Sequence, residues 1–273
     1  MRWRDAFFEA IQWLRHQWQG RIRHGVHSPF VFDLQTGILK DAAMVPLPEI
    51  ERLRRDLLAD NSKFDRLDFG AGSRSSSATS TRVNDFARKS LQSEHAARVL
   101  RGLADGIQAR RVLELGTAFG ITTAYLAYER PQRYVCTIEG DPLVAKKANE
   151  VWNNLGIASI ESLVANFDDA IVDVIKGQPL FDLILVDGNH TYEATCRYWQ
   201  SLKTHISAGG CIVFDDIYWS REMNDAWQFI QNDRDVSLTL DYFHWGVVFT
   251  FPRPQKEHYR LKLPTMAPRT RYY

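Results

Sequence analysis

The sequence has few cysteines, almost no net charge and no long hydrophobic run, and each absence removes a class of protein. Its 273 residues include 3 cysteines, an odd number that cannot pair completely, which fits a reducing compartment. No apolar stretch approaches the roughly 18 residues that a membrane-spanning helix needs. Charges interrupt the first twenty residues, unlike a signal peptide. We therefore predict a cytoplasmic protein without a membrane span.

The charge balance gives no case for nucleic-acid binding. The chain has 34 lysines and arginines against 33 aspartates and glutamates, a formal net charge of +1, whereas nucleic-acid-binding domains usually carry a marked basic excess. Basic residues gather near both ends, where they could meet an acidic partner or simply face solvent, and the second arrangement is the commoner one. They are Arg2, Arg4, Arg15, Arg21 and Arg23 at the start, and Arg253, Lys256, Arg260, Lys262, Arg269 and Arg271 at the end. We expect no nucleic-acid partner. The sequence is compatible with a homodimer.

Length and composition indicate one large globular domain with an extension. Apolar residues make up 45% and charged residues 25% of the chain, which is ordinary for a protein that buries a core. At about 150 residues per domain, the length suits one domain plus an appendage. The patterns predict an N-terminal helical appendage with a flexible loop over 1–92, the main domain over 93–251 and a basic C-terminal tail over 252–273.

The first predicted helix spans residues 5–18 and is amphipathic. Its apolar side chains recur at roughly helical spacing, with charges between them. They are Phe7, Phe8, Ile11, Trp13, Leu14 and Trp18. Such an aromatic stripe could face a membrane or a partner, but packing on the protein's own core is the commoner use. We therefore expect this stripe to pack against the rest of the chain.

Two histidines follow this helix. His24 and His27 are three residues apart, which invites a metal-site interpretation, but no cysteine or carboxylate accompanies them at ligand spacing. A packed loop or a loop that faces a substrate is favoured instead. Ser28 and Pro29 are typical of a helix N-cap and a first helical residue. They predict a helix over Phe30–Leu39.

A glycine turn opens the last part of the appendage. After a short predicted helix over Pro46–Leu58, the Ser/Thr-rich segment Asp68–Arg82 lacks the apolar period of a packed helix and is predicted to be a flexible loop. Successive N–H groups around Gly70 and Gly72 could bind an anion, and such a loop could close over a ligand. A plain surface turn is an equal alternative.

The stretch Val112–Ala127 organises the main domain. An apolar run that carries Glu114 leads into a loop with Gly116 and Gly120, and an apolar helical pattern begins at Ile121. These features predict a strand, a glycine turn and a helix. Small residues let the backbone approach a ligand closely, and the free N–H groups at the helix start favour an anionic group. A phosphate or a carboxylate would suit this turn equally well.

Strand and helix patterns alternate through the main domain. The predicted strands are Val112–Leu115, Tyr134–Ile138, Ser159–Ala165, Phe181–Val186, Cys211–Phe214, Ser237–Tyr242 and Val247–Phe251. Continuous apolar strands separated by helices indicate an α/β fold with a doubly wound parallel sheet. The short connection Phe243–Gly246 predicts that the last two strands pair antiparallel. Cys136 and Cys211 fall inside these strands, so we expect two buried free thiols.

The glycine spacing disfavours a dinucleotide. A dinucleotide fingerprint reads GxGxxG, whereas this turn reads GTAFG from Gly116 to Gly120. The next strand ends at Glu139, which is placed to accept hydrogen bonds from both hydroxyls of a ribose. The alternative role of Glu139, a helix-capping charge, is already supplied by Asp141 before Pro142. The sequence therefore predicts a nucleoside-containing ligand other than NAD.

These features resemble the class I S-adenosylmethionine-dependent methyltransferases, close to the small-molecule O-methyltransferases of the catechol and caffeoyl-CoA type. The resemblance covers about residues 93–251. It is carried by the motif ELGTAFGITTAYLA, by Glu139 and by the acidic strand ends at Asp187 and at Asp215 and Asp216. The family implies a Rossmann-like seven-stranded sheet with strand order 3-2-1-4-5-7-6 and an antiparallel last strand. The predicted hairpin agrees with that order.

The resemblance also implies how S-adenosylmethionine would be held. The residues implied in cofactor binding are Glu114, Gly116, Thr117, Gly120, Thr122, Glu139, Asn166, Asp168 and Asp187. The glycine turn would pass beneath the methionine part, Thr122 would hold its carboxylate, and Glu139 would hold the ribose. Asn166 or Asp168 would face the adenine amino group. Helix capping is an equal alternative for Asp168.

In catechol-type enzymes, two aspartates and an asparagine hold a divalent metal, and the base follows the first aspartate by three residues. Asp187, Asp215 and Asp216 match the metal-ligand positions, with Asp216 in place of the asparagine, and His190 falls at the base position. Such ligands suit Mg²⁺ or another hard cation, which would lower the pKa of an acceptor hydroxyl. His190 would then take the proton. The catalytic residues implied are therefore His190 and Asp187.

The acceptor and the metal stay open at this stage. The segments VDGNHTYE and FDDIYW are more similar to a branch that includes sugar and antibiotic-tailoring methyltransferases, in which metal use is uneven. A small-molecule or saccharide acceptor is expected. Tyr192, Tyr218 and Trp219 could line its pocket or pack against helices. The acidic strand ends could instead cap the helices that follow them.

Two functions of other classes are kept beside methyl transfer. The first is a non-catalytic S-adenosylmethionine-binding protein whose N-terminal segment recruits a partner. The second is a nicotinamide oxidoreductase, which the glycine spacing disfavours. Calorimetry that compares S-adenosylhomocysteine with NADH distinguishes this last alternative from the other two.

Overall fold

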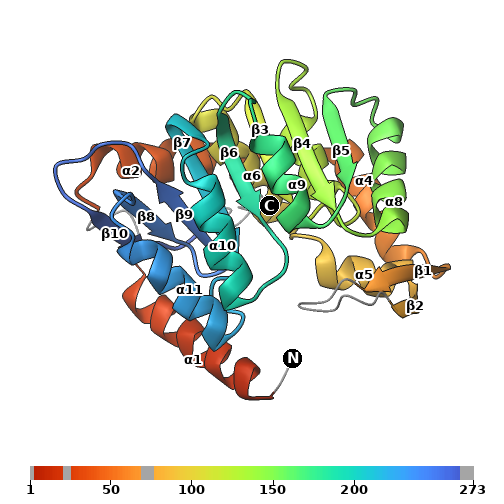
Figure 1. Cartoon of the computed structure of the whole chain (residues 1–273), viewed down its shortest axis with the longest axis horizontal. Coiled ribbons are helices and arrows are strands. Elements are labelled where there is room, and N and C mark those ends of the chain that lie inside the picture. Colours follow the sequence, from red (N-terminus) through yellow and green to blue (C-terminus); the bar gives the residue numbers. More distant parts are fainter. Residues whose placement is uncertain (1–2, 21–25, 69–76, 265–273) are drawn as a thin grey trace, which may run out of the picture.

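The computed structural model describes residues 3–20, 26–68 and 77–264. Within these ranges the chain forms an eight-stranded sheet and a separate two-stranded sheet. Figure 1 shows the large sheet covered by helices, with the small hairpin at one end of the molecule. Among these residues no helix combines the length and the apolar character needed to cross a membrane.

Residue 92 is the predicted boundary between the appendage and the main domain, and both parts contain helices and strands. Before it lie α1 (Trp3–Gln19), α2 (Pro29–Asp33), the π-helical turn η1 (Leu34–Ile38), α3 (Leu39–Met44), α4 (Pro48–Ala59), β1 (Lys63–Asp68), β2 (Ser77–Arg82) and α5 (Val83–Ser90). After it lie α6 (Glu94–Gly106), β3 (Arg111–Leu115), α7 (Ile121–Ala127), β4 (Tyr134–Glu139), α8 (Pro142–Asn154), β5 (Ile160–Val164), α9 (Phe167–Ile175), β6 (Phe181–Val186), α10 (Tyr192–Leu202), β7 (Ile206–Asp215), α11 (Arg221–Asn232), β8 (Leu238–Asp241), β9 (Trp245–Phe249) and β10 (Glu257–Arg260). Strands and helices thus alternate through most of the main domain, as the sequence predicts.

The strands of the large sheet run in the order β10-β8-β9-β7-β6-β3-β4-β5. Counted from β3 to β9, this is the predicted order 3-2-1-4-5-7-6, and β9 runs antiparallel to β7 and β8 as predicted. The strand count differs, because β10 adds an eighth strand parallel to β8. It lies inside the segment predicted to be a tail, and Tyr259 and Leu261 there are buried. Part of that segment therefore belongs to the sheet.

Neighbouring residues of each central strand point into different apolar cores. Val112 and Cys211 belong to the core shared with α6, and Leu113 and Cys136 belong to the core shared with α9, α10 and α11. Figure 1 shows α9 and α10 on the near face of the sheet and α6 on the far face. Both cysteines are buried free thiols, as predicted. Because helices cover both faces of the sheet, a ligand can reach its central strands only at their ends.

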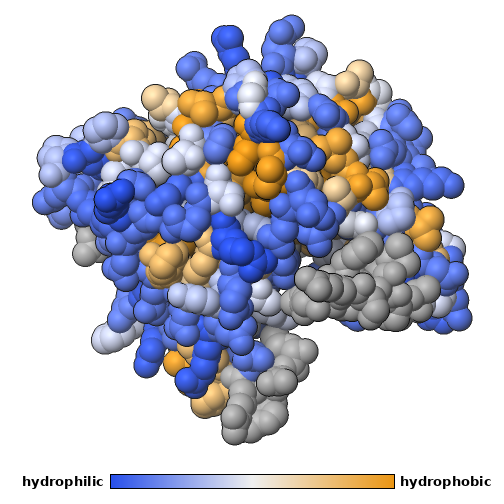
Figure 2. Space-filling view, in the orientation of Figure 1, coloured by the Kyte–Doolittle hydropathy of each residue, from blue (hydrophilic) through white to orange (hydrophobic). Residues whose placement is uncertain are grey.

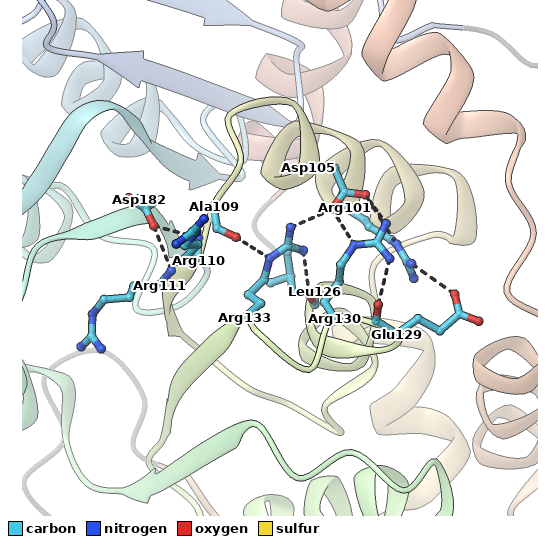
Figure 3. Close-up of polar contacts among 10 residues, drawn as sticks. All are labelled: Arg101, Asp105, Ala109, Arg110, Arg111, Leu126, Glu129, Arg130, Arg133 and Asp182. Carbon is cyan, nitrogen blue, oxygen red and sulfur yellow. Dashed lines mark hydrogen bonds and ion pairs between the residues drawn. The ribbon is translucent and has the colours of Figure 1, made fainter.

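A polar network closes the edge of the sheet at which the central strands begin (Figure 3). Asp105 at the end of α6 accepts hydrogen bonds from Arg130 and Arg133. Arg133 also donates to the backbone carbonyls of Ala109 and Leu126, at 2.8 Å each. Burial raises the pKa of Asp105, but the hydrogen bonds from the two arginines outweigh it and the pKa is lowered. These contacts hold the end of α6, the end of α7 and the turn before β4 together. They lie at the opposite end of the sheet from the carboxyl ends of the strands.

Helix α1 presents its apolar side chains to solvent, so the prediction that the stripe packs on the core is wrong for most of it. The exposed fractions are 65% for Phe7, 47% for Trp13, 61% for Leu14 and 87% for Trp18. The face that docks is mixed. Phe8 and Ile11 are half-buried, and the buried His16 packs against the Phe243 ring with its Nε2 3.1 Å from the backbone oxygen of Asp241. Hydrophobic side chains are visible at the lower left of Figure 2, where α1 lies.

The segment predicted to be a flexible loop over Asp68–Arg82 is partly a strand. Residues Ser77–Arg82 form β2, which pairs antiparallel with β1. Its alternating threonines suit an extended chain, which explains why this part of the segment forms a strand. The predicted anion site around Gly70 and Gly72 lies outside the described residues.

The start of α2 follows the prediction. Ser28 is its N-cap and Pro29 its first residue, and the helical segment continues through η1 and α3 as far as Met44. His27 is exposed, and His24 lies outside the described residues.

Candidate active site

A cavity of about 710 Å³ opens at the carboxyl ends of the central strands. Its walls come from the loops after β3 to β7, from the segment between β1 and α6, and from the turn between β8 and β9. The predicted site residues that line it are Gly116, Glu139, Asn166, Asp187, His190, Asp215 and Asp216. This volume suits a small-molecule ligand. The cavity thus brings both groups of predicted residues, the cofactor side and the acceptor side, to one place.

Gly116 allows the end of β3 to approach the end of its parallel neighbour β6 closely. Its φ is +102°, and a Cβ at this position would lie 1.8 Å from the backbone oxygen of Asp187. Backbone hydrogen bonds hold this arrangement: Gly116 N donates to Ile138 O of β4 at 3.0 Å, and Asp187 N donates to Leu115 O at 2.8 Å. Only glycine fits such a position. The turn therefore fixes one wall of the cavity directly beside the first carboxylate.

Glu114 lies behind this turn and is not among the described residues that line the cavity. It is fully buried, and its Oε2 accepts hydrogen bonds from Thr123 at 2.5 Å and Thr137 at 2.6 Å. The hydroxyls of Thr137 and Thr117 lie 2.6 Å apart. Burial raises the pKa of Glu114 to about 8. Glu114 and Thr117 therefore connect β3, β4 and α7 by hydrogen bonds behind the turn. Glu114 could affect cofactor binding only indirectly, by fixing the backbone of the glycine turn.

We expect Glu114→Gln to remove part of the pH dependence of stability. The pKa of Glu114 is about 8 in the folded protein against an ordinary 4.5, so its contribution to the free energy of unfolding is present below pH 4.5 and is lost as the pH rises through 8. Glutamine keeps the shape and cannot ionise. In urea unfolding, the free energy of unfolding of the variant relative to the wild type should rise by a few kcal/mol between pH 5 and pH 9, since one pKa unit is about 1.4 kcal/mol. A constant difference across this range would contradict the assignment.

Gly120 and Thr122 lie at the start of α7, outside the described cavity lining. Gly120 is the N-cap, with φ +71°, and its carbonyl accepts a hydrogen bond from the Trp152 indole at 2.8 Å. A Cβ at Gly120 would lie 2.6 Å from that ring. Thr122 is 8% exposed. Gly120 thus serves the packing of α7 against α8, and the contact between Thr122 and a carboxylate stays a prediction.

Glu139 ends β4 with its carboxylate in the cavity wall. Its Oε2 accepts a hydrogen bond from the N–H of Ala118 at 3.0 Å, and its Oε1 accepts one from the N–H of Asp141 at 3.1 Å. Asp141 itself caps α8 through Leu143 and Val144, as the sequence predicts. The N–H of Gly140 also hydrogen-bonds this carboxylate. A carboxylate has about four acceptor positions, so Glu139 can still accept a hydrogen bond from a ligand hydroxyl.

Asn166 and Asp168, the two candidates for the adenine contact, occupy different positions relative to the cavity. Asn166 lines the cavity and is also the N-cap of α9, because its Oδ1 accepts a hydrogen bond from Asp168 N at 2.8 Å. Asp168 forms an ion pair with Arg197 at 3.0 Å on the surface and is not among the described lining residues. Position therefore favours Asn166 over Asp168 for a ligand contact.

Asp187, His190 and Asp216 form the other side of the cavity. His190 Nε2 lies 3.8 Å from Asp187 Oδ1 and 3.9 Å from Asp216 Oδ2. Burial raises the pKa of Asp187, His190 lowers it and Asp216 raises it, and the net shift is upward. The imidazole thus stands between two carboxylates that would stabilise it once it is protonated. This arrangement suits a general base.

Asp215 is held by a residue that the sequence analysis missed. The side-chain amide of Gln92 donates to Asp215 Oδ2, and burial together with the nearby Asp187 raises the pKa of Asp215 well above its usual range. The three predicted metal ligands line one cavity. In the described part of the chain, however, no group of three or more His, Cys, Asp or Glu side chains is arranged to hold a metal ion. The predicted metal set is therefore not formed in this structure.

Three non-glycine residues in the cavity wall have left-handed backbone conformations. They are Ala118 with φ +49°, Asn189 with φ +52° and Asp216 with φ +55°. Each follows the carboxyl end of a central strand, after β3, β6 and β7 respectively. Such conformations cost free energy and cluster at functional sites. The strain supports a ligand-binding role for this edge of the sheet.

The alternative role of the acidic strand ends, helix capping, is filled by other residues. Thr191 caps α10 and Ser220 caps α11, each by accepting a hydrogen bond from a backbone N–H in the first turn. Asp187, Asp215 and Asp216 line the cavity instead.

The aromatic walls of the cavity differ from those predicted. Tyr192, Tyr218 and Trp219 are not among the described residues that line it, and the Tyr218 hydroxyl donates to Asp241 at 2.7 Å. The rings that line the cavity are Phe86, Phe167, Tyr198 and Trp245. They come from α5, α9, α10 and β9, and no motif in the sequence marks them. Nearness in sequence to the carboxylates was therefore a poor guide to the pocket walls.

Part of the chain is similar to known methyltransferases. Residues 113–217 match a family model described as a methyltransferase domain. A catechol O-methyltransferase of Mycobacterium tuberculosis is 34% identical over 116 residues, which is 42% of this chain and 51% of the relative. The chain thus matches about half the length of that curated relative.

Solved structures share the fold. The O-methyltransferase TomG from Streptomyces achromogenes, solved with S-adenosylmethionine, has a TM-score of 0.52 at 20% identity over 60% of this chain and 82% of its own. An O-methyltransferase from Bacillus cereus, solved with S-adenosylhomocysteine, has a TM-score of 0.56 at 16% identity over 77% of this chain and 93% of its own. The resemblance to class I methyltransferases and the Rossmann-like fold class predicted from the sequence are confirmed.

Proposed function

We propose that this chain is an S-adenosylmethionine-dependent methyltransferase that acts on an oxygen of a small molecule or saccharide. The observation that supports this proposal is that one cavity of about 710 Å³ is lined both by Gly116 and Glu139 and by Asp187 and His190. The first pair suits a nucleoside with a short anionic tail. The second pair suits proton removal. A matching methyltransferase-domain model over residues 113–217 supports the same reaction class.

The cofactor side of the cavity acts by positioning. S-adenosylmethionine supplies an electrophilic methyl group on a sulfonium when it is bound. Glu139 presents two carboxylate oxygens that the N–H groups of Ala118 and Asp141 hold in place, so the ribose would be fixed at both hydroxyls. Gly116 lets the backbone approach the methionine part. The adenine would lie near Asn166.

The acceptor side supplies the base. In the proposed reaction the acceptor oxygen forms a bond to the methyl carbon, the bond from sulfur to that carbon breaks, and S-adenosylhomocysteine leaves. The hydroxyl proton goes to His190 Nε2. Asp187 and Asp216, at 3.8 and 3.9 Å from that nitrogen, stabilise the resulting imidazolium. Holding the acceptor in line with the methyl group accounts for most of the acceleration expected of such a site.

The cofactor assignment predicts that Glu139→Gln weakens S-adenosylhomocysteine binding by roughly 10- to 100-fold, since a hydrogen bond to a charged group contributes about 1.5–3 kcal/mol. Glutamine still accepts one hydrogen bond from Ala118 or Asp141 but cannot accept at both oxygens. Isothermal titration calorimetry with S-adenosylhomocysteine and with NADH measures the effect and the ligand preference together.

Asp168→Asn is the matched control for this titration, because Asp168 pairs with Arg197 on the surface and should leave the affinity unchanged. Equal losses in the two variants would contradict the role of Glu139. Tighter binding of NADH than of S-adenosylhomocysteine by the wild type would reject the methyltransferase proposal itself.

The second candidate is a non-catalytic cofactor-binding protein that recruits a partner. The observation in its favour is the solvent-facing apolar side of α1, with Phe7, Leu14 and Trp18 each more than half exposed. Release of S-adenosylhomocysteine from S-adenosylmethionine in the presence of a catechol or a methyl glycoside favours the enzyme. Cofactor binding without turnover of such acceptors favours recruitment. A homodimer formed through α1 would appear in light scattering as a doubled mass.

A further inference from the structure

Gln92 enters the cavity from the connection between α5 and α6, outside the strand framework that carries the predicted motifs. Its backbone carbonyl accepts a hydrogen bond from Arg54 of α4. Arg54 Nε lies 2.9 Å from Glu51 Oε1, and the Tyr125 hydroxyl of α7 donates to the same oxygen at 2.7 Å. Arg54, Glu51 and Tyr125 are all buried. This chain of contacts anchors Gln92 to two helices, so buried structure fixes where its amide lies.

The Gln92 side chain contacts both strand-end carboxyls. Its Nε2 donates to Asp215 Oδ2. Burial raises the pKa of Asp187, and hydrogen bonding from Gln92 opposes that rise. The amide is oriented with its NH₂ group as the donor in this network. The NH₂ group has donors and no lone pair for a cation. It therefore brings the positive end of a dipole to the place where two carboxyls meet.

A divalent cation would need the oxygen atoms that Gln92 engages. Mg²⁺ takes about six oxygen ligands in near-octahedral geometry. Asp215 Oδ2 is bonded to Gln92, and Asp215 Oδ1 is enclosed by protein and receives no hydrogen bond from the described residues. Asp216 has φ +55° and its Oδ2 lies 3.9 Å from His190. The residues present thus do not fit a bound cation, in agreement with the absence of a three-ligand group among the described side chains.

We propose that the Gln92 amide takes the place of a divalent cation between Asp187 and Asp215, as a positioning residue for both. The two carboxyls then keep a fixed geometry beside His190 without a metal, and methyl transfer in this chain does not require one. This inference rests on the proposed function for the reaction that the site serves. Its consequence for metal affinity, however, can be measured on protein without cofactor or acceptor.

Manganese binding tests the proposal, with electron paramagnetic resonance to count bound Mn²⁺. Wild-type protein should show no saturable binding below about 1 mM, because its carboxyls present no open set of oxygen ligands. Gln92→Glu removes the amide and adds a fourth carboxylate to those of Asp187, Asp215 and Asp216, and it should bind one Mn²⁺ at least about tenfold more tightly. Gln92→Leu is the matched control, since it removes the amide without adding a ligand. Because Gln92→Leu frees the Asp215 oxygen that the amide engages, it should bind Mn²⁺ more tightly than the wild type and less tightly than Gln92→Glu. A merely structural role for Gln92 would leave Gln92→Leu at the wild-type affinity.

Saturable binding of one Mn²⁺ by the wild type, abolished in Asp215→Asn, would overturn the proposal, and so would a wild-type methyl transfer rate that EDTA abolishes and Mn²⁺ restores. Equal Mn²⁺ affinities of Gln92→Glu and the wild type would also overturn it, provided that thermal unfolding shows both to be folded. The expected Mn²⁺ pattern without any methyl transfer would leave the position of Gln92 supported and would reject the proposed function alone.

Discussion

His190→Ala is expected to slow methyl transfer roughly 100- to 10 000-fold, the range that a general base contributes, while the affinity for S-adenosylhomocysteine stays within about twofold. His190 lines the acceptor side of the cavity, and its Nε2 lies 3.8 Å from Asp187 Oδ1 and 3.9 Å from Asp216 Oδ2. Alanine removes the proton acceptor and leaves the Glu139 side intact. The release of S-adenosylhomocysteine in the presence of catechol measures the rate, and calorimetry measures the affinity.

His27→Ala is the matched control for this experiment. His27 is exposed and is not among the described residues that line the cavity, so its removal should not change the rate. Asp187→Ala should also slow transfer, because the imidazolium loses a stabilising charge. If His190→Ala and Asp187→Ala both kept the wild-type rate on an acceptor that turns over, the proposed site would be wrong.

Residues at strand ends were predictable because strand geometry places them. In a parallel sheet the carboxyl ends of the strands meet at one edge, so Glu139, Asp187 and Asp215 could be assigned to a common site from their place after apolar runs. The order of the strands followed from the family resemblance, and the antiparallel β9 also followed from a connection too short to cross the sheet. Local pattern plus topology was enough for this part of the site.

Residues that reach the site from elsewhere were not predictable in this way. Gln92 precedes a helix and carries no motif, and its position depends on contacts with Arg54 in another helix. Phe86 and Trp245 line the cavity because their elements fold back onto the strand edge. Such positions follow from tertiary packing, to which a single sequence gives no periodic signal.

The docking of helix α1 is a second feature that the sequence did not predict. Its spacing predicted an amphipathic helix correctly, but hydrophobicity alone did not decide which face would dock. The buried face carries His16, which reaches the backbone of Asp241, whereas Trp18 is 87% exposed. The docked side of α1 thus combines half-buried Phe8 and Ile11 with the His16 contact, and sequence spacing alone does not show which part of the stripe docks.

The largest effect on folding is expected for Gly116→Ala. The new Cβ would lie 1.8 Å from the backbone oxygen of Asp187, and φ at this position is +102°. Neither strand end can move without breaking the hydrogen bonds from Gly116 to Ile138 and from Asp187 to Leu115. A left-handed alanine costs about 1 kcal/mol and overpacking a further 1–3 kcal/mol. Urea unfolding should therefore show a loss of roughly 3 kcal/mol, and S-adenosylhomocysteine binding should disappear.

Gly209→Ala separates the two causes of this loss. Gly209 has φ +88°, close to that of Gly116, but a Cβ there would meet nothing within 4 Å. It should therefore lose only the roughly 1 kcal/mol of backbone strain and keep full affinity for S-adenosylhomocysteine. Equal losses in the two variants would mean that positive φ alone sets the requirement for glycine. A larger loss confined to Gly116→Ala, together with the loss of binding, would show that the turn needs glycine because the ends of the neighbouring parallel strands β3 and β6 approach closely there. This close approach places Asp187 beside the cofactor turn.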